Sequence, residues 1–264
     1  MSNAIVASVT RAGAYEPFDL QVARGQIYGH SVVSLFGYNG NITSSTAPTT
    51  APIPMWENAT AYTFPSSAAV LTVVSSSTSD NTSASILISG LDASYNPLSE
   101  TLFLNGTTAV TSVNSYYRVN AVTLVSAGTS QVTNVGTITL KQGTNIVAQI
   151  NPKVGKNQAS IYSVPNGYTF YLNVVEVNSD NTLGSGNGMY YNVQQTVNGV
   201  QYNVLTQGFS SVYVIDRSSA PFAYPQKSDI QWQIATTSST AILSGAIIIG
   251  KLIQNNNTVT GVGT

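Results

Sequence analysis

Side chains with acid–base or metal-binding chemistry are few in this chain of 264 residues, which contains one histidine, no cysteine and ten Asp or Glu residues. Any Ser-His or His-metal scheme must therefore use His30, whose nearest acid in the sequence is Asp19. His30 lies in "YGHSVV", and no second histidine exists to join it on a metal. We interpret His30 as a packing or hydrogen-bonding residue.

Two pairs of acids are close enough in sequence to suggest paired carboxylates, Glu16 with Asp19 and Asp216 with Asp229. Glycoside hydrolysis needs two carboxylates a few ångströms apart, and sequence spacing alone does not establish this. We interpret all four as solvated loop acids, assign no catalytic residue, and expect a protein that is not an enzyme. The rival hypothesis, a hydrolase that uses His30, predicts a deep pocket in which His30 faces Ser, Asp or Glu.

Several short motifs resemble ligand sites but have simpler interpretations. "GSGNG" at 184–188 lacks the Lys-Ser/Thr of a phosphate loop, so it predicts a hairpin tip. Three aspartates in turn sequences predict local Asx hydrogen bonds rather than Ca²⁺ ligands. Five Asn-x-Ser/Thr sequons follow from composition. We predict no cofactor and no metal site. The aspartates are Asp80, Asp92 and Asp180; the sequons begin at Asn41, Asn58, Asn81, Asn105 and Asn256.

Composition indicates a protein that works by contact with other chains. Charged residues make up 7% of the chain, against about 25% in ordinary soluble proteins. A monomer of 27.7 kDa exposes on the order of 11,000 Å², which the nine basic and ten acidic side chains do not cover. The net charge of -1 also provides no basic surface for nucleic acid or anionic membranes. We therefore expect a homo-oligomer, with a trimer favoured, and neither nucleic-acid nor membrane partners.

The chain divides into three regions. Residues 1–65 are rich in Gly, Pro and Asn and predict an extended N-terminal arm that packs along the β-domains or a neighbouring subunit. Residues 66–157 and 158–264 consist of short β-branched and aromatic runs separated by turn residues about every ten positions. This spacing predicts an all-β fold with two β-sandwich or jelly-roll-like units and a polar C-terminal tail.

The sequence of the second β-domain predicts specific turns and the burial of specific strand faces. Pro165 to Gly167 predicts a turn, and Asn198-Gly199 is the dipeptide preferred in two-residue hairpins. "DIQWQIA" from Asp229 alternates apolar residues with Gln, which predicts one buried and one wet face. "AIIIG" from Ala246 predicts a strand buried on both faces. Most tyrosines, Tyr168 and Tyr171 among them, lie in such strand patterns and are predicted to pack.

Three long motifs resemble virion structural proteins of tailed bacteriophages, especially marine and cyanobacterial phages. They are "RGQIYGHSVVSLFGYN" (Arg24–Asn39), "GLDASYNPLSETLFLNGTTAVTSVNSYYRVN" (Gly90–Asn120) and "SIYSVPNGYTFYL" (Ser160–Leu172). The resemblance covers about residues 20–175 and implies a virion protein of the head-decoration kind. It provides no catalytic residue to transfer.

We therefore expect a capsid decoration or cement protein that binds and stabilises the shell of the major capsid protein. It would be made in the host cytoplasm and located in the virion, on the capsid exterior. The alternative is a tail or head fibre, an adhesin whose β-domain binds a host surface glycan. This alternative predicts a concave, exposed patch lined by Tyr or Trp.

Overall fold

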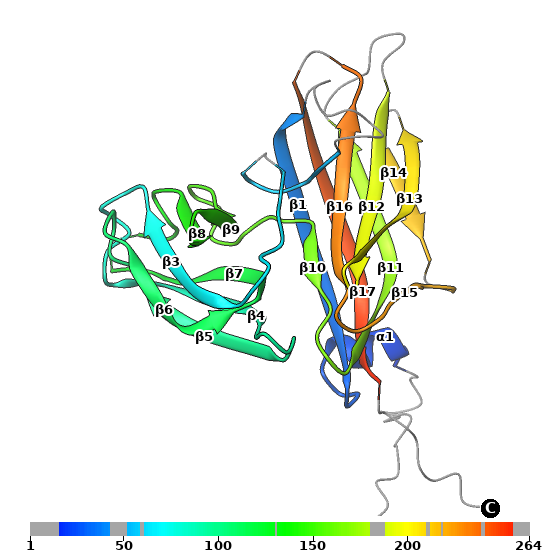
Figure 1. Ribbon diagram of the computed structural model, residues 1–264, viewed down its shortest axis with the longest axis horizontal. Coiled ribbons are helices and arrows are strands. Elements are labelled where there is room, and N and C mark those ends of the chain that lie inside the picture. Colours follow the sequence, from blue (N-terminus) through cyan, green and yellow to red (C-terminus); the bar gives the residue numbers. More distant parts are fainter. Residues whose placement is uncertain are drawn as a thin grey trace, which may run out of the picture.

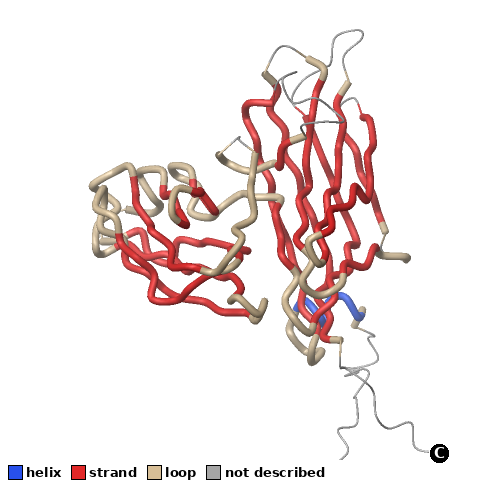
Figure 2. Tube along the Cα trace, viewed as in Figure 1, coloured by secondary structure: helices blue, strands red, loops and turns tan. Residues whose placement is uncertain are grey.

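The computed structural model describes residues 16–42, 52–58, 61–129, 131–179, 188–209, 212–217, 219–238 and 241–255. These residues form one six-residue helix, α1 (Phe18–Ala23), and seventeen strands in four antiparallel sheets. Figure 2 shows that strands make up most of both units. The prediction of an all-β fold is confirmed.

The first sandwich is the smaller unit in Figure 1. One sheet has the strand order β6-β3-β8-β9 and the other β5-β4-β7, and both contribute to one buried apolar cluster that includes Ile86, Ile88 and Leu140. Its strands are β3 (Ala69–Ser75), β4 (Ala84–Leu91), β5 (Pro97–Phe103), β6 (Val110–Tyr116), β7 (Arg118–Ala127), β8 (Ile138–Gln142) and β9 (Asn145–Ile150).

The second sandwich is the taller unit in Figure 1. Its sheets have the orders β1-β17-β11-β14 and β10-β16-β12-β13, with β15 and β2 added beside β11 and β16, and Phe170 and Trp232 from opposite sheets share one core. Its strands are β1 (His30–Ile42), β2 (Ile53–Pro54), β10 (Ile161–Ser163), β11 (Tyr168–Ser179), β12 (Met189–Val197), β13 (Val200–Phe209), β14 (Val212–Asp216), β15 (Phe222–Tyr224), β16 (Asp229–Thr236) and β17 (Ile242–Gln254).

The prediction of an extended arm is wrong for β1, which is a full strand of the second sandwich. It pairs with β17 from His30 to Ile42, and Val33 and Leu35 pack against the core. Glycine at 37 is required because a Cβ there would lie 2.8 Å from the Cβ of Ser160. Gly37 and Asn39, which suggested an irregular segment, are thus buried positions of this strand. Residues 1–15 and 43–51 lie outside the described part of the chain.

The first sandwich is inserted within one strand position of the second. β2 pairs with β16 at Gln233 and Ile234, and β10 pairs with the same strand from Asp229 to Gln231. The chain therefore leaves this position after β2, forms β3 to β9, and returns to it at β10. A bridge between Trp56 and Ala159 joins the outgoing and returning segments. This arrangement brings the two sandwiches side by side.

Both predicted turns form. Asn198 and Gly199 have φ of 51° and 77° and connect β12 to β13 through the pair Val197 and Val200, as a type I′ hairpin requires. Gly167 has φ of 79° in the turn between β10 and β11. These two strands do not pair with each other, because β10 belongs to one sheet and β11 to the other.

The two predictions about strand faces are wrong. Every residue of β16 is buried, including Gln231 and Gln233. The amide of Gln231 donates to the carbonyl of Tyr62, so the segment between β2 and β3 covers the face that was expected to be wet. In contrast, β17 is not buried on both faces, since Ile248 is fully buried but Ile249 is 37% exposed.

Candidate functional site: a cleft between the two sandwiches

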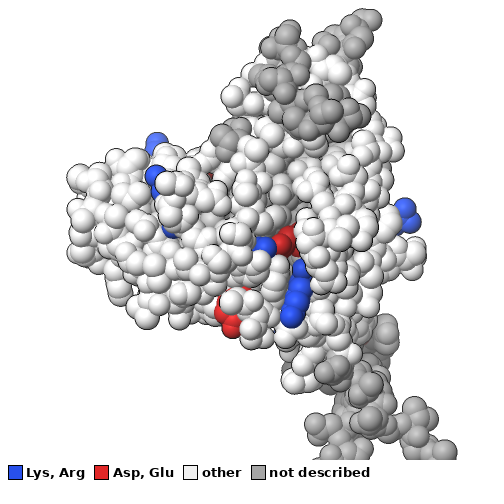
Figure 3. Space-filling view, in the orientation of Figure 1, with Lys and Arg blue, Asp and Glu red and all other residues white. Residues whose placement is uncertain are grey.

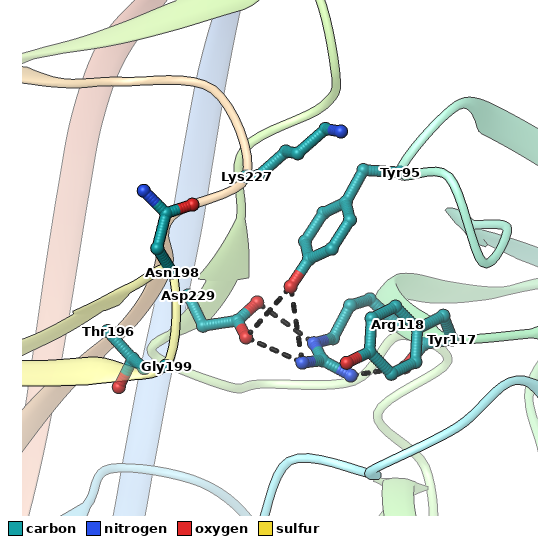
Figure 4. A pocket seen from close by; sticks show the side chains of 8 residues that line it. All are labelled: Tyr95, Tyr117, Arg118, Thr196, Asn198, Gly199, Lys227 and Asp229. Carbon is teal, nitrogen blue, oxygen red and sulfur yellow. Dashed lines mark hydrogen bonds and ion pairs between the residues drawn. The ribbon is translucent and has the colours of Figure 1, made fainter.

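The described structure contains a cleft of about 250 Å³ where the two sandwiches meet. Figure 4 shows Asp229 and Arg118 meeting between the two walls. The first sandwich contributes the turn between β4 and β5 and the junction of β6 with β7. The second contributes the β12–β13 hairpin and the segment that leads into β16. The lining residues are Tyr95, Tyr117, Arg118, Thr196, Asn198, Gly199, Lys227 and Asp229.

A buried ion pair forms the floor of this cleft. Nε of Arg118 donates to Oδ1 of Asp229 at 2.9 Å, and Nη2 donates to Oδ2 at 2.6 Å. The two side chains are only 5% and 6% exposed. Burial alone would lower the pKa of Arg118, but the hydrogen bonds and charge of Asp229 outweigh burial and raise it. Arg118 is therefore permanently charged.

The remaining hydrogen-bonding groups of this ion pair are also occupied. Nη1 of Arg118 donates to the carbonyls of Pro65 and Tyr117, and its Nη2 donates also to the hydroxyl of Tyr95. Asp229 accepts further hydrogen bonds from the hydroxyls of Ser163 at 2.6 Å and Tyr95 at 3.2 Å. A pair with every donor engaged is organised to hold the structure together.

Aromatic rings enclose the guanidinium. Its central carbon lies 3.7 Å from the ring centroid of Tyr117, and Tyr95 packs edge-on against the same ring at 5.3 Å. Burial and the charge of Asp229 raise the pKa of Tyr95 above its ordinary value. Tyr95 is therefore a neutral hydrogen-bond donor to Asp229 across the physiological range.

Further hydrogen bonds cross the junction beside the cleft. The Asn120 amide donates to the carbonyl of Ser163 and accepts from its backbone N–H, both at 2.9 Å. The backbone N–H of Asn166 donates to the carbonyl of Tyr95 at 2.9 Å. The junction is thus held by directional polar contacts in addition to the chain connections.

The structure separates His30 from the other acid–base candidates. His30 is the first residue of β1, its Nδ1 lies 2.9 Å from the carbonyl oxygen of Tyr28, and its ring packs edge-on against Phe18. Glu16 pairs with Arg24, and Asp19 pairs with Lys251. Within the described ranges neither acid contacts His30, so the three residues do not form a catalytic group.

The second predicted acid pair is not brought together either. Asp216 is an exposed residue at the end of β14, whereas Asp229 begins β16 in the opposite sheet. Interpreting Asp229 as a solvated loop acid is wrong, because it is the buried partner of Arg118. The sequence did contain a signal: Arg118 interrupts an apolar strand pattern in a chain with few charges.

The turn aspartates differ from one another. Asp92 accepts hydrogen bonds from the backbone N–H groups of Ser94 and Asn96, so its predicted Asx turn is confirmed. Asp80 instead is buried and accepts hydrogen bonds from the backbone N–H groups of Val135 and Gly136, more than fifty residues away. The local interpretation of Asp80 is therefore wrong.

Other predicted motifs lie partly outside the described residues. This holds for Asp180, for the sequon at Asn256, and for all of "GSGNG" except Gly188. Within the described ranges, no three His, Asp or Glu side chains gather as metal ligands, and no helix has the length and apolar character to cross a membrane.

Charged side chains are sparse over the face shown in Figure 3, where a few basic and acidic groups meet near the junction of the sandwiches. The β12–β13 hairpin, residues 189–209, contains no Asp, Glu, Lys or Arg. On β13, Val200 and Tyr202 are each 52% exposed, and among the described strands β13 pairs with β12 alone. β13 is thus an uncharged, open sheet edge.

No protein-family model and no curated protein sequence matches the chain. Among solved structures, it is similar to the infectious bursal disease virus VP2 subviral particle, with 12% identity, 87% of this chain and 73% of that chain covered, and a TM-score of 0.24. The infectious bursal disease virus Gx strain matches at 12% identity over 92% and 78%, also with a TM-score of 0.24. Scores this low do not support an argument about fold or function.

Proposed function

We propose that this chain is a non-enzymatic structural protein of a virion, acting as a decoration or cement protein on the capsid exterior. The observation that carries the proposal is the strand order of the second sandwich. When the main strands of this sandwich are numbered from one to eight in chain order, without the short β2 and β15, the two sheets have the orders 1-8-3-6 and 2-7-4-5. The eight numbered strands are β1, β10, β11, β12, β13, β14, β16 and β17. This order supports a jelly roll, a double-sheet architecture of eight strands that is common in viral capsid domains.

Fold alone does not select a function, since jelly rolls also occur in lectins and cupins. The surface supports an assembly role. An open strand edge such as β13 is a template for pairing, and natural proteins usually protect such edges with lysine, proline or a covering segment. The residues of β13 include no lysine and no proline. Contact with other chains would provide hydrogen-bond partners for the backbone groups of this edge.

The mechanism that we propose is stabilisation by preferential binding. A protein that binds the assembled shell, but not its separated subunits, adds its binding free energy to the stability of the shell. The partners would be the major capsid protein and other copies of this chain. The trimer favoured by the sequence stays a prediction.

Gold-labelled antibodies against the native protein, imaged on purified particles by electron microscopy, test this proposal. Labels distributed over the head would support it. Labels confined to the tail or to fibres would instead support the alternative, an adhesin. Particles that remain unlabelled when disrupted as well as when intact would contradict a virion role.

A further inference from the structure

We propose that the cleft between the sandwiches binds one sugar ring of a glycan. This proposal does not depend on the capsid role, because either a shell protein or a fibre could carry such a site. It rests on the unengaged groups at the mouth of the cleft, on the aromatic wall and on the backbone conformation of the lining residues.

The mouth of the cleft contains polar side chains that the rest of the described chain leaves unengaged. They are the ammonium of Lys227, the amide of Asn198 and the hydroxyls of Thr196 and Tyr117, none of which has a side-chain hydrogen bond within the described ranges. Hydroxyl and amide groups both donate and accept, whereas the ammonium only donates. Sugar hydroxyls also donate and accept, so this set is complementary to them.

The floor determines where a ligand would lie. Arg118 and Asp229 have no free hydrogen-bonding capacity, as the contacts above show, so a ligand gains nothing by displacing them. An uncharged polar ligand over this closed pair avoids the cost of burying another charge. Therefore the floor favours a neutral ligand at the mouth over an ionic one at the bottom.

Tyr95 and Tyr117 provide an apolar wall beside these polar groups. In Figure 4 Tyr95 lies opposite Asn198 across the cleft, and Tyr117 lies against Arg118. A sugar ring has an apolar C–H face and a rim of hydroxyls, so it matches a site with an aromatic wall and polar side chains around it. The volume of about 250 Å³ restricts the site to a single ring.

Backbone conformation also distinguishes the cleft. Among described residues other than glycine, four have φ in the left-handed region, and three of these line the cleft: Tyr95 at 65°, Asn198 at 51° and Lys227 at 63°. The type I′ turn explains Asn198. Tyr and Lys rarely adopt this conformation, which is retained mainly where a function depends on it. The fourth residue, Lys153, is not among the residues that line the cleft.

Protein-observed NMR titration of the full chain with glucose, galactose, mannose and N-acetylglucosamine tests the proposal. We expect at least one sugar to shift the backbone amide signal of Gly199. Lys227→Asn removes the ammonium and Tyr117→Phe removes the hydroxyl, and each should weaken binding about three- to tenfold, the effect of one hydrogen bond. Lys153→Asn is the matched control, since it changes a lysine of the same backbone conformation elsewhere, and it should leave binding unchanged.

Thermal melting of each variant separates loss of binding from loss of folding. Tyr117→Phe retains the ring that packs on Arg118, so this variant reports on the hydroxyl if Lys227→Asn folds poorly. The proposal is overturned if no sugar in the panel shifts the cleft signals. It is also overturned if a sugar binds with equal affinity to the wild type and to both cleft variants.

Discussion

Arg118 and Asp229 are 111 residues apart in the chain and form a bidentate, buried ion pair across the junction of two sandwiches. Among the described residues, neither Arg118 nor Asp229 forms another ion pair within its own sandwich. The pair thus couples the inserted sandwich to the one that receives it.

Removing one member of this pair should destabilise the fold strongly. Arg118→Met would leave Asp229 buried without its counter-charge, and we expect a loss of about 3 to 5 kcal/mol in the free energy of unfolding. Urea denaturation followed by circular dichroism measures this loss. Arg217→Met is the control: Arg217 stacks on Phe222 at an exposed site, and it should cost less than about 1 kcal/mol. Equal losses in the two variants would contradict a coupling role for Arg118.

Part of this architecture can be predicted from local sequence. The Asn198-Gly199 hairpin forms as predicted because the required φ values suit these two residue types. β1 was missed because its alternation is interrupted by Gly37, a residue needed for the close approach of Ser160. The Arg118–Asp229 pair was missed because no local pattern specifies which distant charge a buried arginine meets.

Burial was also difficult to predict where coverage comes from a distant segment. The alternation in β16 indicated a wet face, but Tyr62, in the segment between β2 and β3, covers Gln231. Only the path of the chain around the inserted sandwich determines this. The turn aspartates show the same limit of local sequence. Asp92 accepts a hydrogen bond from nearby Ser94, as its local sequence predicts, whereas Asp80 accepts one from the distant Val135.

Asp80 should contribute more to stability than Asp92. Its carboxylate accepts hydrogen bonds from Ser75, Val135 and Gly136 in a buried site. Asp80→Asn would place an amide N–H₂ against a backbone donor, with an expected loss of about 2 to 3 kcal/mol in unfolding free energy. Asp92→Asn keeps the Asx turn and should cost less than about 1 kcal/mol. Thermal denaturation of both variants checks the ranking, and a larger effect at Asp92 would refute it.

Glu57 should make the protein less stable as pH rises. Its Oε1 accepts from the backbone N–H of Gln158, its Oε2 is buried with no hydrogen bond among the described groups, and burial raises its pKa from 4.5 to about 8. Between these values the folded state holds a proton that the unfolded state has released. The free energy of unfolding should therefore fall with increasing pH, by at most about 1.4 kcal/mol per pH unit, and level off above pH 8.

Glu57→Gln isolates this effect. The variant keeps the shape and the acceptor for Gln158 but does not titrate, so its stability relative to the wild type should increase between pH 5 and 8. Urea denaturation at several pH values measures the difference, in which the contributions of other carboxylates cancel. A difference that stays constant across this range would show that Glu57 is ionised in the folded state.

His30 should be dispensable for chemistry. Its ring contacts Phe18 and the carbonyl of Tyr28 at the start of β1, so His30→Asn should cost about 1 kcal/mol in stability and leave particle assembly intact. Denaturation and particle yield test this expectation. If the variant folded normally but lost a hydrolytic activity that the wild type shows, the enzyme hypothesis would replace ours.

The uncharged edge at β13 should support self-association. Light scattering at micromolar concentration should give a mass above 27.7 kDa, with three copies as the sequence-based expectation. Val204→Lys places a charge on the exposed part of β13 and should weaken association. Lysine at the exposed Val113 of the first sandwich is the control and should not. A wild-type mass of one chain at every concentration would rule out self-association in solution.

The central claim, a structural role in the virion shell, is tested most directly by the number of copies per particle. Quantitative mass spectrometry of purified particles gives the ratio of this chain to the major capsid protein. Our account predicts a fixed ratio that corresponds to copies on the order of hundreds, as repeated lattice positions on a shell require. A ratio that corresponds to six to a few dozen copies, or a chain absent from washed particles, would contradict it.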